Sequence, residues 1–285
     1  MSTQDPDLGG RELSPAITTL SAVVAVVSIL TGALMAVAGL TGHAFGAWHS
    51  PEALSPGLIG AAMVGVSPGL LVVGRARVWE EVRTLVLPTA VVLVGLFAVS
   101  VADGRELHVA TGGLIVLVMF SLGWVAVLGA LAAASVLCLV VQYRRPVTAP
   151  PARTAPLPAW SKPLLAVLGS GWLGLGTGLV LAPRFWGGLV PWAVGRADAQ
   201  GLGVWCLALG VGVLGALAED DLARLRPALL SVPGVALASA VLLAGRAGDV
   251  TWSSGAALPL VVLLAGLLST GAIGHWLLTR RAVPA

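Results

Sequence analysis

Three of the four histidines fall into two predicted loops on the same side of the chain, next to acidic residues. One loop holds His43 and His49, and the other holds Asp103, Glu106 and His108. Imidazole and carboxylate groups can exchange protons with a substrate, and both bind Zn²⁺. The spacing within each loop matches no diagnostic metal-ligand pattern. We therefore expect no bound metal. If the protein is an enzyme, these five residues are the candidate catalytic residues.

Four tryptophans lie on the same predicted side and are candidate ligand-binding residues: Trp186, Trp192, Trp205 and Trp252. Tryptophan is enriched where a membrane meets water, so an aromatic belt explains these positions without any ligand. A cleft for a hydrophobic molecule is the alternative interpretation.

Motifs of known catalytic or cofactor chemistry are absent from the sequence. There is no Gly-x-Ser-x-Gly or His-Glu-x-x-His motif, and Cys138 and Cys206 lie far apart in apolar segments. His275 has no second histidine at a matching depth, as a transmembrane haem would require. The sequence therefore predicts no cofactor and favours a protein that is not an enzyme.

The composition shows which solvent surrounds these residues. Only 10% of the 285 residues are charged and 57% are hydrophobic, with a mean hydropathy of +0.96. A soluble globule needs a solvated exterior that such a chain cannot supply. A soluble enzyme, a disordered chain and a disulfide scaffold are excluded. The expected partner is the lipid bilayer, and no nucleic acid is expected.

Eight apolar segments are long enough to cross a bilayer as helices. None alternates apolar and polar residues, as the strands of a barrel would. We predict an all-α, polytopic membrane protein with helices near Ile17–Gly39, Gly57–Gly74, Leu85–Ala102, Gly112–Val141, Pro163–Ala182, Gly201–Leu217, Ala228–Gly245 and Ala256–Leu278.

The basic residues predict an orientation. With eight spans, twelve of the 16 fall on the side of the termini: Arg11, Arg75, Arg77, Arg83, Arg144, Arg145, Arg153, Lys162, Arg224, Arg226, Arg280 and Arg281. The other side holds Arg105, Arg184, Arg196 and Arg246. Positive residues concentrate on cytoplasmic loops, so both termini are predicted to be cytoplasmic. The lack of Asn and the near-absence of Lys are typical of a high-GC bacterium, which predicts the bacterial cytoplasmic membrane.

The chain also resembles itself at an offset of about 145 residues, which predicts a duplicated four-helix unit inserted twice in the same direction. Thr31-Gly32 matches Thr177-Gly178, and two charged elbows correspond, RARVWEEVRTLVLP and AEDDLARLRPALLSVP. We expect Val78, Val82, Leu222 and Leu225 of these elbows to face lipid. The predicted units are a tail at 1–16, a first repeat at 17–145, a Pro/Ala-rich linker at 146–162, a second repeat at 163–281 and a tail at 282–285.

Three functions remain open. The favoured one is a permease, a permease subunit or a binder of a lipid or small hydrophobic molecule between the two halves, because substrate sites often lie between repeats. The second is a membrane-embedded enzyme that uses the His/carboxylate set on the outer face. The third is an assembly or structural partner, associating through small-residue helix faces that comprise Ser170, Gly174 and Gly178, and Gly266, Thr270 and Gly274.

Overall fold

The computed structural model describes residues 10–147 and 155–281, and all regular elements in these ranges are helices. The prediction of a polytopic helical membrane protein is confirmed, because eight of the described helices are long and apolar enough to cross a membrane. They are α1 (Pro15–Leu40), α2 (Leu54–Val72), α3 (Arg83–Ala102), α5 (Ile115–Arg144), α6 (Ser161–Leu181), α8 (Arg196–Glu219), α9 (Arg226–Gly245) and α10 (Ala257–Arg281).

Two short α-helices and five 3₁₀ turns connect the long helices. The short helices are α4 (His108–Thr111) and α7 (Pro183–Gly187), and the turns are η1 (Val73–Arg75), η2 (Trp79–Glu81), η3 (Gly104–Glu106), η4 (Leu222–Leu225) and η5 (Ala247–Asp249). The fourth predicted span begins later than expected, because Gly112 and Gly113 have φ values of +77° and +124°. Residues other than glycine rarely adopt such backbone angles, and a helix cannot continue through them. The two glycines therefore separate α4 from α5.

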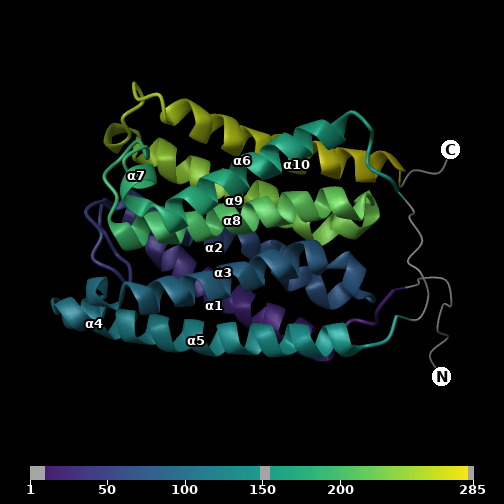
Figure 1. Ribbon diagram of the computed structural model, residues 1–285, viewed down its shortest axis with the longest axis horizontal. Helices are drawn as coiled ribbons and strands as arrows, with labels where there is room; N and C mark the ends of the chain where they lie inside the picture. The colour runs from purple at the N-terminus through teal and green to yellow at the C-terminus, as the bar shows by residue number, and fades with distance from the viewer. Residues whose placement is uncertain (1–9, 148–154, 282–285) are drawn as a thin grey trace.

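The long helices run side by side along the long axis of the molecule in two groups (Figure 1). The first group is α1, α2, α3 and α5, and the second is α6, α8, α9 and α10. Within each group the first helix packs on the second and the third on the fourth, while α2 packs on α9 and α3 on α8 across the boundary. A Cβ atom on Gly65 of α2 would overlap the backbone of Val235 in α9. The two groups are therefore in direct backbone contact.

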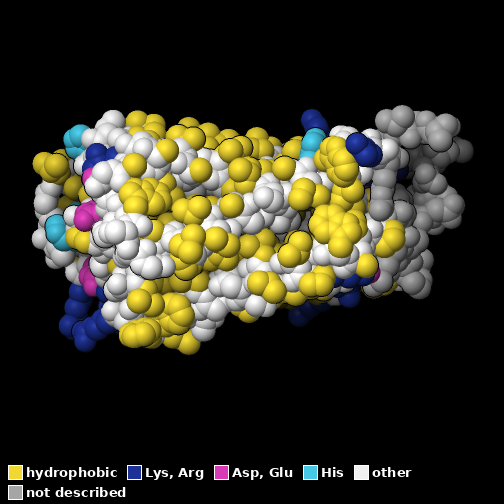
Figure 2. Space-filling model, turned by 90° about the horizontal axis from the view of Figure 1, so that it is seen from above, with side chains coloured by type: hydrophobic (Ala, Val, Ile, Leu, Met, Phe, Trp, Pro, Cys, Tyr) yellow, Lys and Arg dark blue, Asp and Glu magenta, His cyan; other side chains and the backbone are white. Residues whose placement is uncertain are grey.

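Apolar side chains cover the middle of the molecular surface, and charged side chains gather toward its two ends (Figure 2). Exposed residues of this surface include Leu30, Leu137 and Val167, which are 69%, 66% and 75% accessible. Exposing so continuous an apolar surface to water is unfavourable, whereas contact with lipid is not. We call the two ends the histidine end, which carries His43, His49 and His108, and the basic end, which carries Arg75, Arg83, Arg144 and Arg224.

The apolar side chains of the two elbows lie in a different environment from the one predicted. Val82, Leu222 and Leu225 are at most 3% accessible, so the prediction that they face lipid is wrong. The reason is that η2 and η4 contact each other where the two groups meet. The apolar side of each elbow is consequently covered by protein.

The small-residue rows contribute mainly to packing inside the chain. A side chain on Gly178 would collide with the ring of Trp186, and one on Gly274 with Leu229. Gly174 has no atom of the described residues within 4 Å of the Cβ position. Association with another membrane protein through these faces stays a prediction.

Candidate ligand-binding site

A cavity of about 560 Å³ lies between α6, α8, α9 and α10 in the half of the molecule nearer the histidine end. Four indole rings line it, and we call it the tryptophan cavity: Trp172 of α6, Trp186 of α7, Trp192 of the segment between α7 and α8, and Trp205 of α8. Leu58 of α2 also lines it. Its volume falls within the range of about 300 to 1,000 Å³ that is typical of small-molecule sites.

The buried indole groups of this cavity differ in their hydrogen bonding. Trp192 Nε1 donates to Ser55 Oγ at 2.9 Å. The Nε1 atoms of Trp172 and Trp205 are buried and have no hydrogen-bond partner among the described residues. An unpaired buried donor is energetically unfavourable in an apolar environment.

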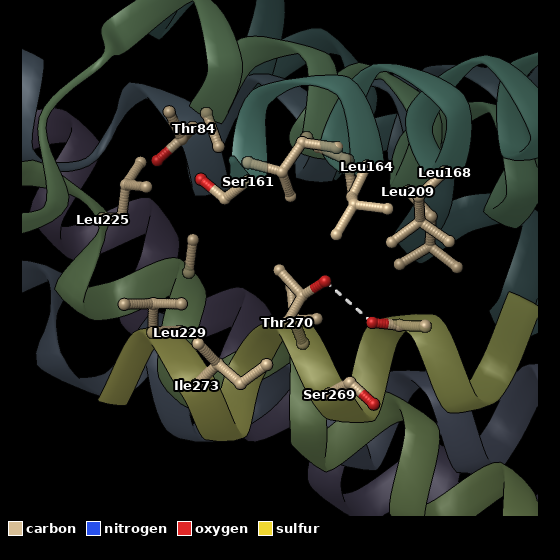
Figure 3. A pocket seen from close by; sticks show the side chains of 18 of the residues that line it. Thr84, Ser161, Leu164, Leu168, Leu209, Leu225, Leu229, Ser269, Thr270 and Ile273 are labelled. Carbon is tan, nitrogen blue, oxygen red and sulfur yellow. Dashed lines mark hydrogen bonds between the residues drawn. The ribbon is translucent and has the colours of Figure 1, made fainter. Parts of the chain in front are cut away.

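A second cavity, of about 540 Å³, lies between the same four long helices toward the basic end, and we call it the basic-end cavity. Leu164 and Leu168 of α6 face Thr270 and Ile273 of α10 across it (Figure 3). Leu209 and Val235 line both cavities. The two cavities are therefore neighbours along one cleft that follows the helix axes.

The linings of both cavities lack charged side chains. The polar groups of the basic-end cavity are hydroxyls, such as those of Ser161 and Thr270, which donate to the carbonyls of Pro158 and Gly266. The hydroxyl of Thr84 is buried without a partner in the described part of the chain. Transfer of an ion into such a lining would cost far more than transfer of a neutral molecule. The chemistry of the cleft suits uncharged hydrophobic ligands.

Charged residues lie just beyond the basic-end cavity and pair with one another. Glu219 at the end of α8 forms an ion pair with Arg83 of α3 and lies 3.6 Å from a guanidinium nitrogen of Arg224. Lys162 Nζ lies 2.8 Å from a carboxylate oxygen of Asp220. These pairs connect α3, α6, the end of α8 and η4 at this end of the molecule.

Three of the four tryptophans selected from the sequence lie together in the tryptophan cavity. Trp252 does not: it is 46% accessible, and its Nε1 donates to the carbonyl of Ala247 at 2.8 Å. Trp172 lines the cavity but was not among the sequence candidates. The available signal was one large aromatic residue within the glycine-rich segment LGSGWLGLGTG.

The structure does not bring all five candidate catalytic residues together. The rings of His49 and His108 lie 5.9 Å apart, edge to face, while His43 hydrogen-bonds to Thr41 Oγ1. Burial is the main cause that lowers the pKa of His108, and the neighbouring His49 lowers it further. Among the described residues, no cluster of three or more metal-binding side chains is present.

The two acidic members of this set bind the start of α8. Glu106 Oε2 accepts from the backbone N–H of Ala197 at 3.1 Å, and Asp103 lies 3.1 Å from Arg196 Nε. Burial raises the pKa of Asp103 despite this arginine. Ser50 donates to Asp198 Oδ1 at 2.8 Å in the same region. These contacts attach loops of the first helix group to the second, which is a structural role.

Comparisons with protein-family models, curated proteins and solved structures found no match.

Proposed function

We propose that the protein is a permease, or a permease subunit, for an uncharged hydrophobic molecule that binds in the cleft formed by the tryptophan cavity and the basic-end cavity. The observation that carries the proposal is the pair of apolar cavities aligned along the helix axes, with Leu209 and Val235 common to both. The second helix group supplies most of the cleft, and α2 and α3 complete its wall.

We further propose that the protein lies in a bacterial cytoplasmic membrane. We place the basic end in the cytoplasm, because most of the arginines gather there. The matching pair contacts of the two helix groups support the predicted duplication, in which one copy has opened a cleft between its first and last helices. A bound molecule would reach the cleft from the bilayer or from either end.

A binding experiment with an uncharged fluorescent probe tests the proposal. N-phenyl-1-naphthylamine is titrated into nanodiscs with and without the protein, and we expect saturable binding only with the protein. Leu209→Trp, which fills the junction of the two cavities, should abolish this binding. Leu137→Trp, on the exposed face of α5, is the matched control and should retain it.

Transport is then measured with the same probe in proteoliposomes that contain this chain alone. Faster exit of the probe than from protein-free liposomes, lost in Leu209→Trp, supports a permease. Saturable binding without transport would assign the chain as a binding subunit. Absence of saturable binding in a folded, monodisperse sample would refute the proposal.

A further inference from the structure

The basic-end cavity opens sideways between α6 and α10. Leu164 of α6 and Ile273 of α10 line the cavity from opposite sides (Figure 3), and they are 63% and 40% accessible. Val167 of α6 also lines it and is exposed. Side chains that are exposed and also line a cavity mark its opening. Because these side chains belong to the apolar surface that lipid covers, the opening faces the bilayer.

Contacts between α6 and α10 close the neighbouring part of this seam. A Cβ atom on Gly266 of α10 would lie 2.7 Å from Leu168 Cδ1 of α6, and a Cβ atom on Gly171 of α6 would lie 3.2 Å from Leu263 Cδ2 of α10. Along both helices these positions are nearer the histidine end than Leu164 and Ile273. The opening therefore lies in the part of the seam next to the basic end.

The same place in the first helix group is closed. The cavity between its first, third and fourth helices has a volume of only about 20 Å³. Buried Gln142, near the end of α5, hydrogen-bonds to the chain at the start of α1: the N–H of Ser14 donates to its Oε1 at 2.9 Å, and its Nε2 donates to the carbonyl of Glu12 at 3.0 Å. Counted from the pair of arginines that ends each group, α10 has Leu278 at this position. Leucine has no hydrogen-bonding group, so it cannot join the last helix to the first in this way.

The length of the cleft favours an elongated ligand. Residues of α10 line it from Pro259, in the tryptophan cavity, to Leu277, in the basic-end cavity. At the rise of an α-helix this distance is roughly 27 Å, close to the thickness of the hydrocarbon core of a bilayer. A compact molecule would fill one cavity, whereas a long chain can fill both.

We infer that the cleft takes up an uncharged long-chain lipid sideways from the bilayer, through the opening between Leu164 and Ile273, and that the hydrocarbon chain of the lipid lies along the helix axes. This inference rests on the proposed function and names its substrate class and entry route. Neither lining has a charged side chain, so the cleft suits a hydrocarbon chain. Entry from the bilayer also avoids exposing the chain to water, which is unfavourable for every methylene group.

Photochemical labelling tests the inference on the native protein. A diacylglycerol with a diazirine in the middle of one acyl chain is added to nanodiscs that contain the protein, and the labelled residues are identified by mass spectrometry after irradiation. We expect labelling of Leu209 and Val235, which line both cavities. Leu93 is the matched control, because it lines the closed cavity of the first group and should stay unlabelled. Leu137, on the exposed face of α5, reports contact with the surrounding lipid.

Competition and a variant give a second readout. Excess N-phenyl-1-naphthylamine, which binds in the same cleft, should reduce the labelling of Val235 and leave that of Leu137 unchanged. Leu209→Trp should have the same effect, because it fills the junction of the two cavities. Labelling of outward-facing residues alone would show only surrounding lipid and would overturn the inference. Equal labelling of Val235 and Leu93 would also overturn it, since the probe would then enter closed parts of the chain as well.

The two proposals fail in different ways. If N-phenyl-1-naphthylamine binds saturably but the lipid probe does not label Leu209 or Val235, the lipid inference is overturned while the proposed function stands. If the naphthylamine does not bind saturably and the lipid probe labels only outward-facing residues, both proposals are overturned.

Discussion

Glu219 contacts two arginines at the basic end. Its side chain is 3% accessible, and it faces the guanidinium groups of Arg83 and Arg224. Removing its charge would leave Arg83 without this carboxylate and Arg224 with Asp221 as a remaining acidic neighbour, which is unfavourable even though Arg83 is partly solvated. A charged side chain close to the apolar part of the molecule is unfavourable unless it is paired, so we expect such charges to be paired.

We predict that Glu219→Gln lowers the free energy of unfolding by about 1 to 3 kcal/mol, the cost of leaving buried charged groups poorly paired. Thermal unfolding in nanodiscs measures this change. Glu12→Gln is the control, because Glu12 is 80% accessible and lies 3.5 Å from Arg145. Such a surface pair contributes about 0 to 1 kcal/mol. Equal effects of the two substitutions would contradict the prediction.

His108 makes stability depend on pH. Burial lowers its pKa below the usual 6.5 in the folded protein, so the unfolded chain binds the proton more tightly. Stability is then lost as the pH falls below 6.5, and it is regained as the pH rises. Asp103 changes stability in the opposite direction and in a lower pH range. Burial raises its pKa in the folded protein, so its contribution to stability is lost as the pH rises above the usual value of 3.8.

We therefore expect the melting temperature of the native protein to fall relative to that of His108→Gln between about pH 7.5 and about pH 5.5, since the variant has no proton to bind at this position in that range. Differential scanning fluorimetry at both pH values measures the two changes. An equal pH dependence in both proteins would show that another group causes it.

At the scale of elements, the sequence predicts well what depends on the length of an apolar segment. All eight spans are present, but α8 begins at Arg196 instead of Gly201. Asp198 ends the uncharged segment of the sequence, and the sequence does not reveal that Ser50 pairs with Asp198.

Contacts between distant elements are much harder to predict. Apolar residues look the same in a sequence whether lipid or protein covers them, as Val82 and Leu222 show. The tryptophan cavity brings together residues of α2, α6, α7, α8, α9 and α10. No local pattern encodes that arrangement.

Gly65 tests the contact between the two helix groups. An added methyl group would meet the backbone of Val235 and Gly234 in α9, and backbone cannot move aside as a flexible side chain can. We predict that Gly65→Ala costs about 1 to 3 kcal/mol through overpacking. Gly174→Ala in α6 is the control, since its methyl group would enter open space and only the better helix propensity of Ala would remain. Chemical denaturation in mixed micelles compares the two variants.

At the scale of the whole molecule, both ends join the two helix groups with polar contacts, while glycine-mediated contact joins them in the middle. The histidine end uses Glu106 and Ala197, and the basic end uses Arg83 and Glu219. Both cavities lie between these two ends.

The orientation of the molecule decides which compartment each end faces, and cysteine labelling can determine it. Arg105 at the histidine end and Arg144 at the basic end are both exposed, so a cysteine at either site should react with a charged maleimide. The background is Cys138→Ala with Cys206→Ala, which removes the native thiols. We expect Arg105→Cys to react in intact cells and Arg144→Cys to react only after the membrane is opened, because arginine-rich ends stay in the cytoplasm. The reverse pattern would invert the predicted orientation. Reaction of both sites in intact cells would contradict their placement on opposite sides of the membrane, and with it the number of spans between them.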